Sequence, residues 1–465
     1  MLGTLDAGKL TLEEIHRFPN GPVVINGTWR WDVLRIFDEL KTGLRKVAER
    51  GLKVESVSTD SWGVDYVWFK DPEPLLTAPY HYRDLVRNAG AFERSFPAVA
   101  ADEIFAETGI QFMTFNTLYQ LHWDAVQRPW IFKTANRFLL IGDYFNHLFS
   151  GVAKAEQSLA STTQLYNPKK KKWSRPLLKK LGLPKKLFPE IVPAGTVLGP
   201  VLPEFGLTGA QVVASCSHDT GAAVAAVPAT GKDWAYLSSG TWSLLGVELK
   251  KPLITDQSRQ YNFTNEVGYG HSIRFLKNII GLWIVQECRR QWSKFDYVEL
   301  RHLAEQAAPL RSLINPNDER FGKPGNMPEK IAAFCRETGQ PEPITPGEFI
   351  RCTLESLALL YRRTLEQLET ITGQPVTTLH IVGGGSQNLL LNQFSANATG
   401  RTVIAGPAEA TATGNILIQA LALGQLKDLA ELRQVVRNSF AMQTYQPQDA
   451  TVWAQAYERF QKLPA

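Results

Sequence analysis

Apolar residues recur at helical spacing in two long segments of the chain. After Asp32, which can cap a helix, the apolar side chains of residues 33–47 fall on one face. A second, longer helix is predicted over residues 345–373, because Thr345 and Glu348 have the spacing of a capping box. Both segments therefore predict amphipathic helices with one buried face.

Shorter apolar runs with strand character alternate with such helices, most clearly in the second half of the chain. In the first half, strand-like runs at 54–59 and 64–69 flank a polar turn. The later order is strand 211–215, helix 220–227, a hairpin of 235–239 with 243–247, strand 376–382, glycine loop 383–386, helix 388–399, strand 402–405 and helix 408–423. This alternation is typical of α/β proteins that hold a nucleotide.

Composition and charge leave this picture unchanged. The chain has 465 residues, of which 44% are hydrophobic and 20% charged, enough for about two to four domains. The net charge of +5 permits an anionic ligand and does not indicate nucleic acid. A lysine-rich stretch at 168–190 is interpreted as a solvated helical surface with Leu177, Leu178 and Leu181 facing inward.

Several classes of protein receive little support. The first residues lack the pattern of a signal peptide, and no apolar run has the ~18 residues of a membrane span, so a cytoplasmic protein is expected. The histidine spacing does not indicate zinc, and no metal-binding residue is predicted. Four cysteines without a CxxC pair are expected to be free thiols, although Cys335 and Cys352 could form a disulfide.

One candidate for catalysis is Asp219, in the sequence SHDTG at 217–221 between a strand and a helix. Ligands of open α/β sheets bind beyond the carboxyl ends of strands, where a carboxylate can accept a proton from a substrate hydroxyl. The alternative is that Asp219 only caps the helix.

Three other stretches are candidates for binding. The turn LSSGTW at 237–242 offers N–H groups and hydroxyls to phosphate, and VGGGSQ at 382–387 permits close approach of a ligand. In TDSWGVD at 59–65, polar groups flank an aromatic ring, which suits a sugar. The alternatives are an ordinary hairpin, a bare glycine turn and a strand connection whose Trp62 is core.

Together these stretches resemble the FGGY family of carbohydrate kinases, and within it the branch that phosphorylates L-rhamnulose. The resemblance covers nearly the whole chain, and the stretches that carry it are TDSWGVD at 59–65, HYRD at 81–84, TGIQFMTFNTLYQL at 108–121, SHDTGAAVAAVP at 217–228, YLSSGTWSLLGVE at 236–248, FTNEVGYGHSIRFLKNIIGLW at 263–283, IVGGGSQNLLLNQFSANATG at 381–400 and IAGPAEATATGNILIQALALG at 404–424.

The resemblance implies two actin-like, ribonuclease-H-like α/β domains with a cleft between them. The implied division is a sugar-binding domain over 1–226, a nucleotide-binding domain over 227–440 and a helical tail over 441–465 that packs back on the first domain. The implied reaction transfers the γ-phosphate of ATP, with Mg²⁺, to the 1-hydroxyl of L-rhamnulose. The alternatives are a kinase for another ketose and a non-catalytic sugar-binding protein. A monomer or small homo-oligomer is expected.

Individual positions match the family's functional residues. Asp219 matches the general base, and the sugar-binding positions are matched by Gly63, His218, Thr220 and Asn278, with Asp219 itself among them. The nucleotide-binding positions are matched by Thr241, Gln286 and Gly384. In the family a strand and a phosphate-binding hairpin come first, whereas residues 1–5 resemble the strand after it. We therefore expect that hairpin to be missing and phosphoryl transfer by this chain to be weak.

Overall fold

The computed structural model describes residues 1–464, which group into two compact units. The first unit comprises residues 1–226, 248–275 and 411–439, and the second comprises 227–247, 276–410 and 440–464. Two later segments of the chain thus group with the first 226 residues. The division into functional domains stays a prediction.

The first unit is assembled from short strands and many helices. Its strands are β1 (Leu2–Asp6), β2 (Lys9–Glu13), β3 (Val23–Ile25), β4 (Thr28–Arg30), β5 (Ser56–Val57), β6 (Tyr66–Phe69), β7 (Arg137–Leu140), β8 (Ala155–Glu156), β9 (Tyr166–Asn167), β10 (Lys172–Trp173), β11 (Ile191–Val192), β12 (Thr196–Pro200), β13 (Gln211–Ala214) and β16 (Thr264–Val267). Its helices are α1 (Val33–Ala48), α2 (Leu85–Asn88), α3 (Ala91–Ser95), α4 (Ala101–Thr108), α5 (Thr117–Gln127), α6 (Trp130–Thr134), α7 (Ile141–Ser150), α8 (Gln157–Thr162), α9 (Arg175–Lys180), α10 (Asp219–Ala225), α11 (Asp256–Gln260), α18 (Ala410–Ala422) and α19 (Leu429–Ser439).

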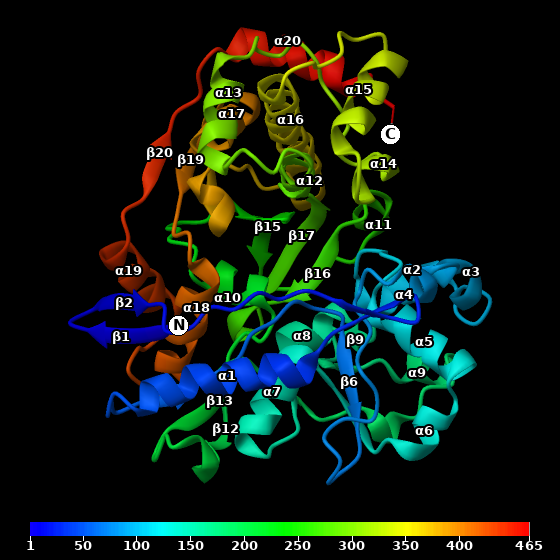
Figure 1. The fold of residues 1–465 in the computed structure, drawn as a ribbon, viewed down its shortest axis with the longest axis vertical. Coiled ribbons are helices and arrows are strands. Elements are labelled where there is room, and N and C mark those ends of the chain that lie inside the picture. Colours follow the sequence, from blue (N-terminus) through cyan, green and yellow to red (C-terminus); the bar gives the residue numbers. More distant parts are fainter. Residues whose placement is uncertain (465) are drawn as a thin grey trace. The chain divides into compact units, whose positions relative to one another are not determined.

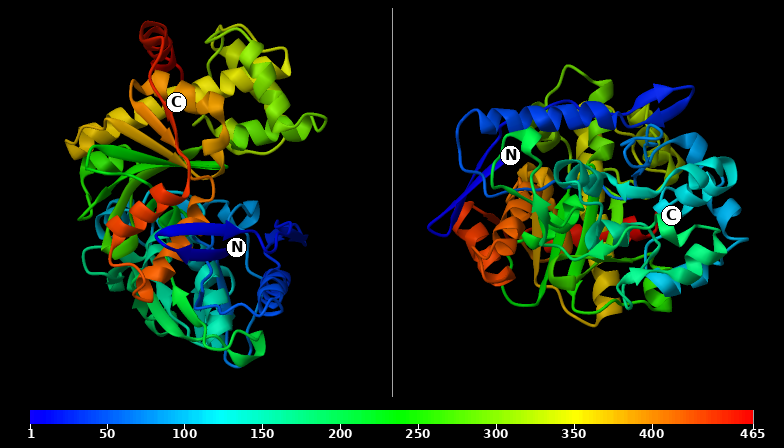
Figure 2. Two further views of the ribbon diagram at one scale, coloured as in Figure 1. Left: turned by 90° about the vertical axis from the view of Figure 1, so that its left-hand side faces the viewer. Right: turned by 90° about the horizontal axis from the view of Figure 1, so that it is seen from below.

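The central sheet of the first unit has the order β12-β13-β5, with β13 parallel to β5 and antiparallel to β12. The β1–β2 hairpin lies beside α19 (Figures 1 and 2), and the Leu10 N–H donates to Ser439 Oγ at 2.7 Å. Residues near the start of the chain and residues after 410 therefore pack together within one unit.

The second unit is built on one sheet, whose strands are β14 (Trp234–Ser239), β15 (Trp242–Leu249), β17 (Ile273–Ile280), β18 (Thr378–Val382), β19 (Thr402–Ala405) and β20 (Gln443–Tyr445). Within the unit the order is β17-β15-β14-β18-β19-β20, and β14, β18 and β19 run parallel. The helices are α12 (Trp283–Gln291), α13 (Tyr297–Gln306), α14 (Glu319–Gly322), α15 (Met327–Glu337), α16 (Pro346–Thr372), α17 (Leu389–Thr399) and α20 (Ala450–Gln461).

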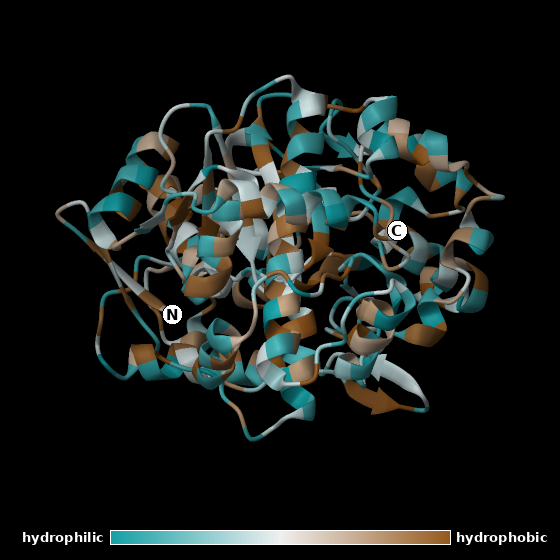
Figure 3. Ribbon diagram, turned by 90° about the horizontal axis from the view of Figure 1, so that it is seen from above, coloured by the Kyte–Doolittle hydropathy of each residue, from teal (hydrophilic) through white to brown (hydrophobic). Residues whose placement is uncertain are grey.

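The two helices predicted first are present. The Asp32 side chain caps α1 by accepting from the Arg35 N–H. Thr345 and Glu348 form the predicted capping box of α16, which ends at Gly373 in the left-handed conformation that favours glycine. Along such helices apolar and polar segments alternate (Figure 3), as expected when one face is buried. In the lysine-rich stretch, Leu177, Leu178 and Leu181 are buried as predicted.

The C-terminal helix α20 belongs to the second unit, where it packs on α16 and α17 (Figure 1). The reason is its apolar face: Trp453, Tyr457 and Phe460 are buried, and the Trp453 ring lies 5.4 Å from that of Phe394. The four cysteines are free thiols, as expected.

Candidate functional site

In the first unit, the structure joins two stretches that the sequence analysis singled out. The Ser61 N–H donates to the Ser217 carbonyl at 2.8 Å, and the Asp219 N–H donates to the Ser61 carbonyl at 2.9 Å. The turn at 59–65 and the segment at 217–221 therefore lie side by side, although more than 150 residues separate them. This pairing brings Gly63 close to the predicted base, Asp219.

Asp219 begins α10, and its side chain is 43% exposed. Thr220 donates to Asp219 Oδ1 from its N–H at 2.6 Å and from its hydroxyl at 3.2 Å. His218 Nε2 lies 3.4 Å from the same oxygen. Within residues 1–464 these contacts all fall on Oδ1, so Oδ2 is left to accept a proton from a bound hydroxyl.

Two charged residues that the sequence analysis missed lie close to the other ring nitrogen of His218, Nδ1. Arg274 Nη2 lies 3.0 Å from His218 Nδ1, and Glu266 Oε2 lies 3.3 Å from it. Arg274 is fully buried and Glu266 is buried beside it, with 3.1 Å between Nη2 and Oε2. The available signal was Arg274, a charged residue between apolar residues of β17; Glu266, in the largely polar strand β16, gave no such signal.

Asp60 is a second missed carboxylate. The pKa of Asp60 is raised to about 6, chiefly by burial; a hydrogen bond from Asn415 Nδ2 lowers it, and the negative charge of Asp219 adds to the increase. Asn415 lies on α18, one turn after Thr411, whose hydroxyl donates to the Asp219 carbonyl at 3.3 Å. Helix α18 therefore contacts the carboxylate of Asp60 and the main chain of Asp219.

Gly63 lies where the 59–65 turn passes close to α8. A Cβ at this position would meet the Thr162 side chain at 3.0 Å, which is tighter than ordinary contact. Beside it, Trp62 packs against Trp31 with 4.2 Å between ring centroids, and its Nε1 donates to Asp65 Oδ2 at 3.0 Å. Burial raises the pKa of Asp65 to about 6. Trp62 is partly buried and packs against the apolar cluster that includes Trp31.

In the second unit, the predicted nucleotide-binding residues come from two turns and from helix α12. Thr241, between β14 and β15, donates from Oγ1 to Gln286 Oε1 of α12 at 3.1 Å. The Thr241 carbonyl accepts from Gly281 and Trp283, both at 3.2 Å. The structure therefore brings Thr241 and Gln286 together.

The glycine loop packs against the same strand end. A Cβ on Gly385 would lie 2.0 Å from Ser239 Oγ, and one on Gly383, whose φ is 84°, would lie 3.1 Å from the Ser239 carbonyl. At Gly384 a Cβ would have no neighbour within 4 Å. Gly383 and Gly385 thus permit backbone contact inside the protein, while Gly384 borders open space that a ligand can occupy.

Asn278 lies on β17 in the second unit, whereas the other predicted sugar-binding residues lie in the first. Its side chain is partly exposed. Its assignment to the sugar site stays a prediction that rests on the family resemblance.

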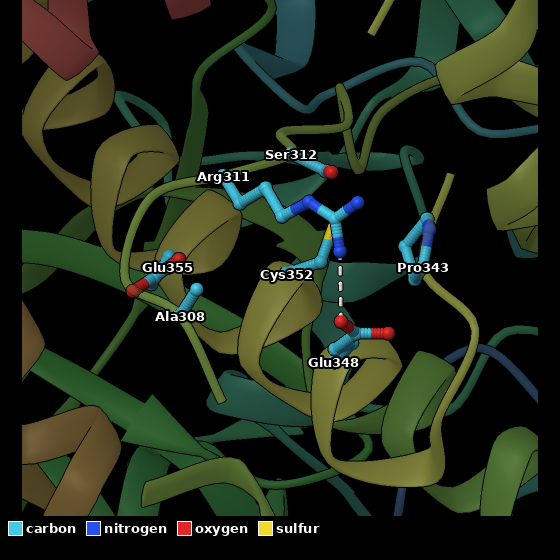
Figure 4. Close-up of a pocket in the computed structure, with 7 residues that line it drawn as sticks. All are labelled: Ala308, Arg311, Ser312, Pro343, Glu348, Cys352 and Glu355. Atoms are coloured by element: carbon cyan, nitrogen blue, oxygen red, sulfur yellow. Dashed lines mark hydrogen bonds and ion pairs between the residues drawn. The ribbon is translucent and has the colours of Figure 1, made fainter. Parts of the chain in front are cut away.

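One hollow of the second unit, shown in Figure 4, has no room for a substrate. It is lined by α16 residues and by the segment at 308–312, and Arg311 donates to Glu348 Oε1 across it at 2.8 Å. Its volume of about 10 Å³ is at most that of one water molecule. No helix within residues 1–464 combines the length and apolarity needed to cross a membrane.

Solved structures of carbohydrate kinases share the fold. Xylulose kinase from Lactobacillus acidophilus matches with a TM-score of 0.81 and 16% identity, covering 98% of this chain and 93% of that one. Glycerol kinase from Plasmodium falciparum with ADP matches with a TM-score of 0.77 and 15% identity, covering 95% and 92%. These likenesses confirm the predicted two-domain, actin-like α/β fold.

Sequence comparison identifies the family. Residues 25–226 match the N-terminal domain of the FGGY family of carbohydrate kinases, and residues 235–423 match its C-terminal domain. The rhamnulokinase of Bacteroides thetaiotaomicron is 43% identical over 99% of this chain and 96% of its own length, and that of Enterococcus faecalis is 43% identical over 98% and 93%. The chain therefore belongs to the FGGY family of carbohydrate kinases.

Proposed function

We propose that this ATP-dependent carbohydrate kinase phosphorylates the 1-hydroxyl of L-rhamnulose. The choice of sugar is supported by the relatives named rhamnulokinase, whose similarity extends over nearly the full length of both chains. The observation that carries the chemistry is Asp219, an accessible carboxylate at the end of a buried strand with one oxygen held and the other left to accept.

In the proposed reaction, Asp219 Oδ2 takes the proton of the sugar's 1-hydroxyl. The hydroxyl oxygen forms a bond to the γ-phosphorus of ATP, and the bond from that phosphorus to the β–γ bridging oxygen breaks. ADP leaves with the bonding electrons, and the proton passes from Asp219 to solvent. General-base help of this kind contributes about 10²–10⁴-fold to a rate.

The other predicted residues bind and orient the substrates. Gly63, His218 and Thr220 would contact the sugar, and the family resemblance adds Asn278 to the proposed sugar-binding residues. Thr241 and Gln286 would approach the phosphates, and Gly384 would leave room for the adenosine. The hydroxyl and N–H groups of the 239–241 turn suit phosphate oxygens, which accept hydrogen bonds.

Mg²⁺ is proposed to arrive with the nucleotide. Residues 1–464 contain no group of three or more His, Cys, Asp or Glu side chains placed to hold a metal ion. We therefore propose an ion that is carried mainly by the phosphates of ATP. There it would neutralise negative charge during phosphoryl transfer. A protein-made metal cage is not part of the proposal.

The test is a coupled ADP-release assay with L-rhamnulose and other ketoses, comparing the wild type with Asp219→Asn. Asparagine keeps the shape and the contacts of Oδ1 but cannot take a proton. We expect turnover to fall by about 10²–10⁴-fold while sugar affinity changes little. Unchanged turnover would reduce Asp219 to a helix cap. Faster turnover of another ketose would overturn the choice of sugar.

A further inference from the structure

A buried cluster of charge lies directly behind His218. The Arg274 side chain has no exposed surface, and its Nε donates to the Val267 carbonyl at 3.1 Å. Its Nη2 lies 3.0 Å from His218 Nδ1 and 3.1 Å from Glu266 Oε2. The Val267 carbonyl of strand β16 therefore holds the guanidinium in place, and the guanidinium faces the imidazole of His218.

This geometry restricts where the proton of His218 can lie. A guanidinium only donates hydrogen bonds and stays protonated in proteins, so the ring nitrogen that it faces must accept. Nδ1 then carries a lone pair, and the single proton of the neutral ring is on Nε2. Nη2 has two hydrogens, so it can face Nδ1 and Glu266 together. Glu266, at 3.3 Å from Nδ1, is already balanced by Arg274.

We propose that Arg274 is a positioning residue that holds His218 as the neutral imidazole with its proton on Nε2, and that Glu266 balances the charge of Arg274. With the proton there, Nε2 faces Asp219 Oδ1, which is 3.4 Å away. Together with Thr220, it fixes one oxygen of the carboxylate and leaves Oδ2 for the sugar hydroxyl. The effect on catalysis rests on the proposed function, in which Asp219 is the base. The tautomer of His218 does not depend on that function.

A second observation indicates that this arrangement serves the site rather than stability alone. Arg274 Nη1 is buried and has no hydrogen-bond partner within residues 1–464. Leaving a buried donor unsatisfied is unfavourable to folding. The charged groups that face His218 are Asp219, Asp60, Glu266 and Arg274, and three of these four are carboxylates. Of these groups only the guanidinium is a pure donor, so without it nothing would require Nδ1 to accept a hydrogen bond.

The test is ¹⁵N NMR of the full chain labelled with [¹⁵N]histidine, without substrates, at pH 8. Loss of a signal in His218→Asn assigns the ring. We expect the wild-type ring to carry its proton on Nε2 and none on Nδ1. A ring that is protonated at Nδ1 would overturn the proposal.

Arg274→Met removes the donor that faces Nδ1, and we expect the preference for the Nε2 tautomer of the His218 ring then to be lost. Arg128→Met is the matched control, because it removes another arginine whose partner is a buried carboxylate, that of Asp124, and should leave the His218 signal unchanged. If Arg274→Met does not fold, Glu266→Gln serves instead: the donor remains, so the Nε2 proton should persist. Loss of that state in Glu266→Gln would show that the carboxylate sets the tautomer and would refute the proposal.

Kinetics separate positioning from binding. Arg274→Lys keeps the charge but not the planar fork, and should lower kcat by up to about 10²-fold with a smaller change in KM for the sugar. An increase in KM alone would contradict a positioning role. If Asp219→Asn keeps full turnover, the proposed function is refuted. The NMR result tests the tautomer of His218 independently of that outcome.

Discussion

Asp60 provides a test of the electrostatics in the first unit. Its carboxylate is largely buried beside Asp219, and its pKa of about 6 lies well above the ordinary aspartate value of about 4. The folded protein therefore binds a proton at Asp60 more tightly than the unfolded chain does. The stability associated with this group is present below pH 4 and is lost as the pH rises from 4 through 6.

The size of the effect follows from the pKa difference. A difference of about two pH units at one group corresponds to up to about 3 kcal/mol, which the ionised carboxylate costs above pH 6. Asp60→Asn has nearly the same shape, keeps an acceptor for Asn415, and carries no charge. We therefore expect the variant to be more stable than the wild type at pH 8 by up to about 3 kcal/mol, and equally stable near pH 4.

The assay is thermal melting of both proteins at pH 4.5 and pH 8, followed by tryptophan fluorescence. At pH 8 the melting temperature of Asp60→Asn should be higher by about 5 °C, since about 2 °C corresponds to 1 kcal/mol in a large domain. Asp65 titrates in the same range in both proteins, so its contribution cancels in the difference. The control is Asp38→Asn, at a side chain that is 73% exposed, which should show no such dependence on pH.

Two outcomes would refute this reasoning. A variant that is less stable at pH 8 would mean that the Asp60 anion is stabilised by its surroundings. A gain of equal size at both pH values would mean that the effect comes from packing or from hydrogen bonding, and not from charge.

Two pairs of glycines give further predictions, each with its own control. Gly385→Ala should destabilise the second unit by about 1–3 kcal/mol, because its Cβ would meet Ser239 Oγ at 2.0 Å. Gly384→Val, at an open position, should leave the melting temperature unchanged and raise KM for ATP about tenfold, equivalent to ~1.4 kcal/mol; a loss of stability instead would assign this glycine to folding. Gly414→Ala should destabilise the first unit by at least about 1–3 kcal/mol, because its Cβ would lie 1.8 Å from a carbonyl of α10. Gly43→Ala, inside α1, would make only ordinary contacts and should stabilise the first unit by about 1 kcal/mol. Urea unfolding should therefore show a lower free energy of unfolding for Gly414→Ala and a higher one for Gly43→Ala than for the wild type.

Much of the fold is predictable because its signals are local. The caps of α1 and α16, the strand before Asp219 and the glycine loop each depend on a few consecutive residues, so the sequence shows them directly. The same holds for the candidate residues at strand ends, such as Asp219 and Thr241. Their neighbours in space could be inferred only from the family resemblance.

The remaining features depend on contacts between distant parts of the chain. Arg274 and His218 are 56 residues apart, and Asn415 and Asp60 are 355 apart. A buried charge in an apolar strand signals that some partner exists, but it does not identify that partner. The placement of α20 on the second unit likewise depends on which apolar face its three aromatic residues meet.

The return of residues 411–439 to the first unit has a consequence for synthesis in the cell. Helix α18 supplies the contacts to Asp60 and Asp219, yet it leaves the ribosome only after some nine-tenths of the chain has been translated. The nascent N-terminal half must wait for these contacts, with its site incomplete, while the second unit is being made. A premature stop codon after residue 400 would therefore disable the base at residue 219 first, far upstream of the lesion.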